Sequence, residues 1–477
     1  MSQRSRFTIR TSDRRVFRRC LRKWSFQSSL KGNWKRSGTE QNINFWFGSA
    51  IHFALEDYHG ENKFGDPRRA FWAYYQSFPK EEMPAAADGM YSLGISMLSY
   101  YLTWYNRHNS VSGYQTARVH KETHQLITAD QWKLLPKEEQ EQYDYAVEQS
   151  FMLPLNYYVV VDVKTDEILE VIDNTKGDQV LPCAVGEEYD YVDPNADLNV
   201  ASRVKIVPIC YHGTMDRIVV DKYGRFWVLD YKTAKGADTN KLETDDQISA
   251  YLWAFEKWYG FKPYGFVYLQ LTKDAVQEPK RLKNGDLSVD KRQKTTYSLV
   301  KQEILKDYGS VQAAPSKIIE FLNYMATLET PEGDRFIRWD HIKRSPEEIQ
   351  STEEHIYEEL AQMLNPNLGY YISPTRDCIW DCPLRDWCLA TERKDNVAIE
   401  QFMKDYEKRP RDEDGNIEPW RENIPWPEKI DPGTKEPYGF KPLEDILSYN
   451  EAMHIEMDSL AEEEDNTGFK FMYEKDV

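Results

Sequence analysis

The sequence predicts a mixed α/β fold, and three features in the middle of the chain carry that prediction. Residues 206–233 are rich in β-branched and aromatic side chains on both sides of a turn signal at 221–224, which indicates a β-hairpin. A helical pattern follows over 244–259, and a further strand pattern covers 265–271. The order strand, turn, strand, helix, strand is typical of a mixed α/β core.

The chain is long enough for a sizeable core, since its 477 residues suit one elaborated domain or two to three smaller ones. The 40% hydrophobic and 14% aromatic residues exclude wholesale disorder, while the 29% charged residues indicate a very polar surface. The longest apolar runs, such as 151–155 and 157–161, are far shorter than the roughly 20 residues that a bilayer-spanning helix needs. We expect a soluble, cytoplasmic protein with no membrane contact.

The N-terminal arm is predicted to form a basic amphipathic helix over 13–24, with Ser12 as its cap. Between residues 4 and 36 arginine and lysine recur, and Asp13 is the single acidic residue. An arginine-rich, acid-poor N-terminus is also typical of an organelle transit peptide, which is the competing interpretation of the arm. The apolar side chains fall near one face of the helix at helical spacing: Val16, Phe17, Cys20 and Trp24.

A second helix is predicted over 45–58, and it carries His52. Helical patterns continue, with breaks at two prolines, to about residue 107, and a strand follows over 148–162. The apolar positions of the second helix recur at every turn and form one stripe: Phe47, Ile51 and Leu55.

The segments beyond this strand are predicted from composition and capping signals. Residues 163–203 are acidic and loop-rich, so we expect an insertion with at most short strands. Residues 279–312 are basic and polar, and 335–342 form a candidate added strand. A last helix is predicted over 345–363, and it opens with a capping-box pair: Ser345 and Glu348.

The hairpin carries the pattern that points to chemistry. Asp216 and Asp230 are equidistant from Tyr223, so the folded strands bring them opposite one another within about one residue of register. Lys232 follows Asp230 by two residues, and side chains alternate along a strand, so the acid and the amine share a face. Two opposed carboxylates destabilise a sheet unless a positive charge lies between them. A divalent cation meets that requirement.

Such a site suits hydrolysis of a phosphodiester bond. That reaction needs hard oxygen ligands for Mg²⁺ or Mn²⁺, a metal-bound water of lowered pKa, and a cation that neutralises developing charge. Asp216 and Asp230 would bind the metal, and Lys232 would position or activate the attacking water. His52 would add an imidazole ligand, which favours Mn²⁺. Taken singly, an Asp-x-Lys triplet and a helical histidine are usually structural, so the prediction depends on their ordered combination.

Four motifs occur in an order that resembles the RecB-like branch of the PD-(D/E)XK nucleases, which includes AddB nuclease domains and CRISPR-associated adaptation exonucleases. The resemblance covers about residues 12–390 and implies a restriction-endonuclease-like core, in which helices flank a mixed central sheet. It also implies a helical N-terminal region and a C-terminal cysteine-cluster region. The motifs are Gly48-x-x-x-His52, Gly213-x-x-Asp216, Asp230-Tyr231-Lys232-Thr233 and Gln247-x-x-x-Tyr251.

The resemblance also implies roles for individual residues. Gln247 and Tyr251, one helical turn apart, would reach the DNA strand or the site from one face of their helix. Glu148, which opens the strand before the insertion, resembles a further family acid. The metal ligands implied by the family are a histidine, two acids and one main-chain carbonyl group: His52, Asp216, Asp230 and Tyr231.

Six cysteines in a chain without a secretory signal predict reduced thiols or metal ligands rather than disulfides. Four of them would suit a tetrahedral thiolate site. The resemblance implies a structural 4Fe-4S cluster that joins the chain ends across the core, although one spacing is three residues where two is commoner. Zn²⁺ in a Cys₄ site and unligated buried thiols are the alternatives. The four candidates are Cys20, Cys378, Cys382 and Cys388.

The net charge of −18 would repel nucleic acid, so the distribution of charge matters more than its sum. The basic arm and the stretch 280–294 would follow phosphates, which favours DNA that is single-stranded or has free ends. Aromatic residues near the site would stack unpaired bases: Trp24, Trp34, Trp46 and Tyr251.

We therefore expect a metal-dependent DNA exonuclease of recombination, repair or phage DNA processing, in the cytoplasm of a bacterium or of a phage-infected cell. A helicase or a recombination protein would be its partner. A structure-specific endonuclease built on the same centre is the first alternative. A catalytically inactive DNA-binding adaptor that retains the fold is the second.

These expectations divide the chain into six segments. The nuclease core is 148–275, with an insertion at about 163–203, and the acidic tail is 396–477. The tail would shield the basic surface, bind a partner or form a solvated appendage. The remaining segments are the basic arm with the first cluster cysteine (1–45), the helical region with His52 (46–147), the basic insertion with the added strand (276–350), and the C-terminal helix with the cysteine cluster (351–395).

Overall fold

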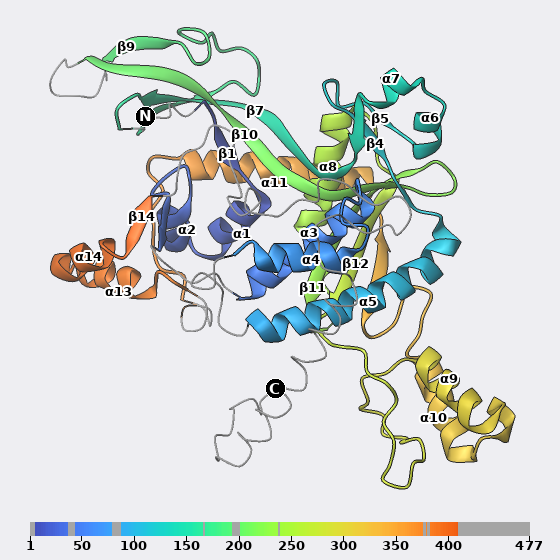
Figure 1. The fold of residues 1–477 in the computed structure, drawn as a ribbon. Helices are drawn as coiled ribbons and strands as arrows, with labels where there is room; N and C mark the ends of the chain where they lie inside the picture. Colours follow the sequence, from blue (N-terminus) through green and yellow to red (C-terminus); the bar gives the residue numbers. More distant parts are fainter. Residues whose placement is uncertain are drawn as a thin grey trace.

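A large mixed β-sheet runs through the molecule with helices on both faces (Figure 1). The strand order is β13-β12-β11-β10-β7-β8, and β1, β3 and β9 also pair with β10. The computed structural model describes residues 5–36, 43–78, 87–165, 167–192, 201–236, 239–374, 378 and 382–408. The strands of this sheet are β1 (Phe7–Ile9), β3 (Gln115–Thr116), β7 (Val147–Asp162), β8 (Ile168–Asp173), β9 (Glu188–Val192), β10 (Ala201–Val220), β11 (Phe226–Ala234), β12 (Gly265–Thr272) and β13 (Ile337–Ile342).

The predicted hairpin forms as β10 and β11. These strands are antiparallel, and Gly224 adopts a φ of 76° in the turn between them, a conformation that glycine reaches without strain. The chain then crosses through α8 (Asp246–Tyr259) to β12, which lies parallel to β11. Strand β13 closes this edge antiparallel to β12, so the added strand predicted at 335–342 is confirmed. The sheet is therefore mixed, as the element order predicts.

Each face of the sheet has its own apolar core. On one face, α3 (Ile43–His59), α4 (Pro67–Gln76) and α5 (Ala87–Ser112) pack on side chains of β11, β12 and β13. On the other face lie α1 (Thr11–Arg19), α8 and α11 (Pro346–Leu364). The stripe predicted for the second helix is fully buried, with Phe47, Ile51 and Leu55 each 0% exposed. Residues on the edges of these cores are therefore held by rigid elements.

Smaller units surround the central sheet. Helices α9 (Tyr297–Tyr308) and α10 (Ser316–Thr327), with the short helix η2 (Val311–Ala313), form a separate small core that projects from the lower right of Figure 1. A three-stranded sheet of β4 (Arg118–His120), β5 (Leu126–Ile127) and β6 (Tyr143–Tyr145) lies with α6 (Ala129–Lys133) and α7 (Lys137–Gln140) at the upper right.

The N-terminal arm and the end of the described chain meet at the left of Figure 1. Strand β2 (Trp34–Arg36) pairs with β14 (Tyr406–Lys408), beside α2 (Leu21–Gln27), α13 (Arg385–Arg393) and α14 (Asn396–Met403). Most of the predicted acidic tail, from residue 409 onward, lies outside the described residues. Within the described part of the chain, no helix is both long and apolar enough to cross a membrane.

Two predicted details of the elements are wrong. The single helix over 13–24 is two helices, because Cys20 adopts an extended conformation (φ −159°, ψ 107°) between α1 and α2. The sulfur of Cys20 then accepts a hydrogen bond from the N–H of Lys23 and caps α2. The first helix starts after Arg10 rather than after Ser12, because Asp13 accepts the main-chain N–H of Arg10 over 3.0 Å. The capping box of Ser345 and Glu348 is confirmed at the start of α11.

Candidate metal centre

Three carboxylates lie in one row across neighbouring strands. In the β10–β11 pairing Arg217 lies opposite Leu229, so the next residues along the two strands, Asp216 and Asp230, also lie opposite one another. The β7–β10 register, continued in the same way, brings Glu148 beside Asp216. Glu148 has a φ of 46°, in the left-handed region that non-glycine residues rarely adopt and that is often found at functional sites. The hairpin thus brings the two predicted aspartates together, and the pairing of β7 with β10 adds the glutamate.

His52 reaches this row from α3, which the buried stripe anchors against the sheet. Its Nδ1 lies 3.5 Å from Oδ2 of Asp216, and its Nε2 lies 2.9 Å from the carbonyl oxygen of Tyr231. Because a carbonyl oxygen can only accept, the Nε2–H is the donor of this hydrogen bond. The N–H of Tyr231 donates to Oδ2 of Asp216 over 2.7 Å and fixes the orientation of that carboxylate.

The ligand atoms of His52, Glu148 and Asp216 all lie within 4.8 Å of one another. In the described ranges of the chain no other three His, Cys, Asp or Glu side chains come as close. One imidazole nitrogen and several carboxylate oxygens fit Mg²⁺ or Mn²⁺, and the nitrogen favours Mn²⁺. The donor set therefore fits the divalent cation that the sequence predicts.

Asp230, at the β11 end of the row, forms a partly buried ion pair with Lys232. The Nζ of Lys232 lies 3.1 Å from Oδ2 of Asp230, which is 1% exposed. Burial raises the pKa of Asp230, the charge of Lys232 opposes that shift, and the charge of Asp216 adds to it. Burial alone would lower the pKa of Lys232, but the carboxylates of Asp230 and Asp216 outweigh it and raise the pKa. The amine is therefore held as an ammonium ion.

Helix α8 contributes the two further predicted residues. Its N-cap Asp245 accepts the N–H of Gln247, and the side-chain amide of Gln247 donates to Oδ1 of Asp230 over 3.2 Å. Tyr251 follows one turn later, and its pKa is raised by burial and by the charges of Asp230 and Asp216. Both side chains therefore face the carboxylate row, as their spacing predicts.

Gly213 has a packing role that its motif position alone does not reveal. A Cβ atom at this position would meet the ring of Phe151 at 2.6 and 2.9 Å and the ring of Tyr251 at 3.4 Å. The ring of Phe151 in turn packs against Tyr211 and against the edge of Tyr251. Gly48 is different, because a Cβ atom there would meet only the hydroxyl of Thr233, at 3.8 Å.

The side chain of Tyr231 points away from the row into the opposite core. Its ring stacks on His59, and its hydroxyl lies 3.4 Å from the guanidinium of Arg217, which is only 2% exposed. Arg217 also donates to the hydroxyl groups of Thr116 and Tyr105. This network fixes the strand segment whose carbonyl oxygen faces His52.

A cavity of about 440 Å³ opens over the site. It is lined by Asn44, Phe45, Gly48, Ser49, His52, Phe53, Glu148, Lys232, Thr233 and Lys273. Phe45 and Lys273 are not among the site residues predicted from the sequence, although the helical phase of the buried stripe places Phe45 on the outer face of its helix.

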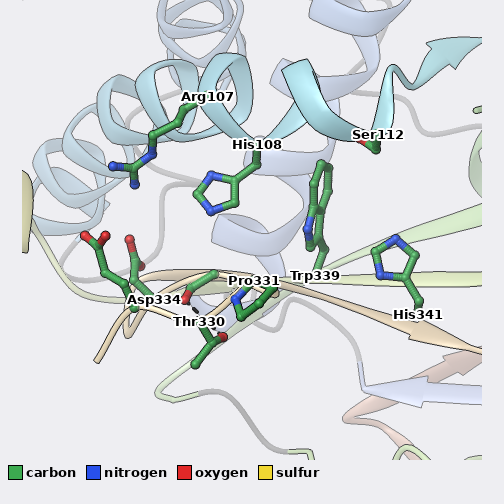
Figure 2. Close-up of a pocket in the computed structure, with 10 residues that line it drawn as sticks. Arg107, His108, Ser112, Thr330, Pro331, Asp334, Trp339 and His341 are labelled. Carbon is green, nitrogen blue, oxygen red and sulfur yellow. Dashed lines mark hydrogen bonds between the residues drawn. The ribbon is translucent and has the colours of Figure 1, made fainter. Parts of the chain in front are cut away.

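A second cavity, of about 430 Å³, lies between α5 and the segment before β13 (Figure 2). Figure 2 shows His108 and Trp339 side by side in it, with Arg107 directed toward the end of the cavity that holds Asp334. No three metal-ligating groups in it come within 4.8 Å of one another among the described residues. It is therefore not the metal centre.

The four cysteines predicted to share a site lie near one another. Burial raises the pKa of Cys382, and the neighbouring thiols of Cys378 and Cys20 raise it further. Burial likewise raises the pKa of Cys388 to about 11, with contributions from Cys20 and Cys382. In the described ranges, no three of these sulfurs lie within 4.8 Å of one another. The thiols of the arm and of the C-terminal cluster are thus neighbours.

The basic arm expected to follow phosphates is paired with acids of the protein. Arg15 and Arg18 bind Asp245 and Asp246 at the start of α8, and the buried Arg14 binds Glu359 over 2.6 Å. These ion pairs fix the arm to α8 and α11 and reduce the charge that it offers to DNA.

Part of the basic stretch 280–294 is similarly paired. Arg281 binds Glu303 and Asp307, and Lys294 binds Asp274 over 2.8 Å. Two of the aromatic residues expected to stack bases, Trp24 and Trp46, are each 1% exposed and belong to the cores. The sequence-based expectation for these two tryptophans is therefore wrong, because both rings lie on the buried faces of their helices.

A sequence model described as "PD-(D/E)XK nuclease superfamily" matches residues 11–389 of the chain. That span includes the whole carboxylate row, α3, α8 and all four clustered cysteines. No curated protein matches the chain.

Proposed function

Since the chain belongs to the PD-(D/E)XK nuclease superfamily, we propose that it is a metal-dependent DNA exonuclease that acts on single-stranded or end-containing DNA. The observation that carries the proposal is the convergence of His52, Glu148 and Asp216 within 4.8 Å, beside the Asp230–Lys232 ion pair. Hard ligands and a cation at one point are what phosphodiester hydrolysis needs.

The residues of the row would have separate roles in metal binding and in catalysis. His52, Glu148, Asp216 and Asp230 would hold the divalent cation together with the carbonyl oxygen of Tyr231. The bound cation supplies a Lewis acid and lowers the pKa of a water molecule that it binds. The N–H of Tyr231 and the amide of Gln247 hold two of the carboxylates in place.

Lys232 acts as a hydrogen-bond donor in this proposal. The carboxylates of Asp230 and Asp216 raise its pKa, which favours the ammonium form. Its N–H groups orient the attacking water and neutralise the charge that develops on the phosphate. The hydroxyl of Tyr251 stays protonated as well and offers a hydrogen-bond donor to the substrate strand.

The proposal is tested with purified wild type and with the single variants Asp230→Asn and Lys232→Ala on labelled DNA. We expect Mg²⁺- or Mn²⁺-dependent release of nucleotides from wild type and a loss of roughly 100- to 1000-fold in each variant. Equal activity in all three proteins would contradict the assignment. Absence of activity in wild type under all metal conditions would instead favour an inactive DNA-binding adaptor.

Linear and circular single strands separate an exonuclease from an endonuclease. An exonuclease degrades the linear strand and leaves the circle intact, because the circle has no end. Cleavage of the circle, or of flap substrates at the junction, would support the endonuclease alternative on the same centre.

We further propose that the chain is of the RecB-like branch and that Cys20, Cys378, Cys382 and Cys388 bind a structural 4Fe-4S cluster. Its support is the proximity of the arm and the C-terminal cluster, which the β2–β14 pair also joins. Zn²⁺ is the rival, because softness of the thiolate ligands does not separate the two. Anaerobically purified protein should absorb at about 400 nm and contain iron. Bound zinc without that absorbance band would rule out the iron-sulfur cluster.

Such an enzyme fits DNA recombination, repair or phage DNA processing in the cytoplasm. A helicase that supplies single strands would be a fitting partner.

A further inference from the structure

Phe45 is the most exposed aromatic side chain in the described part of the chain. Its ring is 77% exposed, whereas the adjacent Trp46 and Phe47 are 1% and 0% exposed. It lies on the first turn of α3, and seven residues, close to two turns, separate it from His52. Helical phase explains why it points outward, but not why an aromatic residue occupies this position.

The place of Phe45 in the molecule suggests a reason. The ring lines the cavity of about 440 Å³ that also holds His52, Glu148 and Lys232. A flat apolar ring on the wall of a polar catalytic cavity is suited to stack against a planar group of the substrate.

Lys273 lies on the same wall. Its ammonium group donates to the side-chain oxygen of Asn44 over 2.9 Å and lies 5.4 Å from the ring centroid of Phe47. Within the part of the chain that the structure describes, it forms no ion pair with an acid. Burial lowers its pKa, and the nearby charge of Lys235 lowers it further. A half-buried cation that faces a cavity beside a second cation favours an anionic ligand.

Other cations of the chain are less suited to this task. Arg15 and Arg18 of the N-terminal arm, and Arg281 and Lys294, are bound to acids of the protein. Lys232 is engaged with Asp230. Lys273 is therefore the cation of the cavity wall that is available to a phosphate group.

We propose that Phe45 and Lys273 form a subsite for one unpaired nucleotide next to the phosphodiester bond that is cut. The base stacks on Phe45, and its phosphate group binds Lys273. A base in a duplex is covered by its neighbours on both faces, so only a single strand, or a frayed end, can use the ring. This inference rests on the proposed nuclease function and explains a preference for single strands by two named side chains.

The test measures binding, not cleavage, so that it stands apart from the proposed activity. Fluorescein-labelled single-stranded and duplex oligonucleotides are titrated with full-length protein in chelator-containing buffer, and anisotropy reports binding. Phe45→Ala should weaken single-strand binding roughly tenfold, as expected for the loss of one stacked base, and leave duplex binding within about twofold. Phe45→Trp should retain wild-type binding. Tyr223→Ala, which removes another exposed ring at the distant hairpin turn, is the matched control and should change neither.

Lys273 is tested through salt dependence. Lys273→Gln should reduce the slope of log Kd against log salt by about 0.7, the value for one phosphate contact with a single strand, and Lys273→Arg should restore it. Lys164→Ala, at an exposed turn, should leave the slope unchanged.

The outcomes are distinct. Equal loss of single-strand and duplex binding in Phe45→Ala, or no loss in either, overturns the subsite. An unchanged salt slope in Lys273→Gln overturns the phosphate contact. If wild type binds single strands through Phe45 but never cuts them, the proposed function fails and the subsite stands. If wild type cuts DNA and Phe45→Ala binds and cuts as wild type does, the subsite alone fails.

Discussion

Replacement of Gly213 by alanine should damage the site without touching any charged residue. The added Cβ would lie 2.6 Å from the ring of Phe151, so that ring must retreat by about 0.8 Å to reach the ordinary contact distance of 3.4 Å. It cannot turn aside freely, because Phe151 is 2% exposed and is packed between Tyr211 and Tyr251. Overpacking of this kind costs about 1–3 kcal/mol.

Two assays measure the effect of Gly213→Ala. Urea denaturation should show unfolding at a lower urea concentration, by an amount that corresponds to about 1–3 kcal/mol. Nuclease activity should fall roughly 10- to 100-fold, because the displaced ring pushes Tyr251 and with it the side of α8 that carries Gln247.

Gly48→Ala is the matched control. The nearest atom to its Cβ would be the hydroxyl oxygen of Thr233 at 3.8 Å, so there is no packing cost. Alanine should therefore stabilise the middle of α3 by up to about 1 kcal/mol. In a Phe151→Leu background the cost of Gly213→Ala should shrink, because the clashing ring is gone. Wild-type stability and activity in Gly213→Ala, or equal costs at both glycines, would refute the packing argument.

Three further predictions follow from the structure. His212 is buried and accepts a hydrogen bond from Arg10, and burial, with the charges of Arg10 and Arg6, lowers its pKa to about 4. As the pH falls, the unfolded chain therefore binds a proton at this histidine before the folded protein does, and the free energy of unfolding should fall by about 3 kcal/mol between about pH 6.5 and pH 4. Urea titrations at several pH values should show a weaker dependence of stability on pH in His212→Gln. An equally steep dependence in that variant would contradict the assignment. Ser345→Ala should cost about 1 kcal/mol by removal of the cap of α11, measured by thermal unfolding, with Ser351→Ala inside the helix as the control. Tyr231→Phe should leave folding intact but weaken Mn²⁺ binding measured by calorimetry, because the hydroxyl that Arg217 contacts is lost; unchanged affinity would show that the network does not orient the Tyr231 carbonyl group.

The central residues of the site could be predicted because their placement depends on local periodicity. A hairpin fixes the register of its own strands, so counting from Tyr223 is enough to bring Asp216 opposite Asp230. The buried stripe of α3 likewise determines which of its residues faces the sheet. For the same reason α8, the parallel strand β12 that follows it and the added strand β13 form close to their predicted positions.

The partners of the basic arm could not be predicted, because they are set by contacts between distant parts of the chain. Arg15 meets Asp245 across 230 positions of sequence, and the arm thereby becomes a structural element rather than a free cationic surface. The break between α1 and α2 at Cys20 could not be predicted either, since no glycine or proline occurs there. The same limit applies to β1, a parallel strand whose partner on β10 lies about 200 residues away.

The claim that a divalent cation binds between α3 and the carboxylate row is tested most directly by X-ray diffraction from crystals soaked in Mn²⁺, with anomalous scattering to locate the ion. We predict an anomalous peak bounded by His52, Glu148, Asp216 and Asp230, with the carbonyl oxygen of Tyr231 in its coordination shell, and loss of that peak in Asp216→Asn. An ion bound only elsewhere, or a row that stays without density at saturating Mn²⁺, would contradict the account.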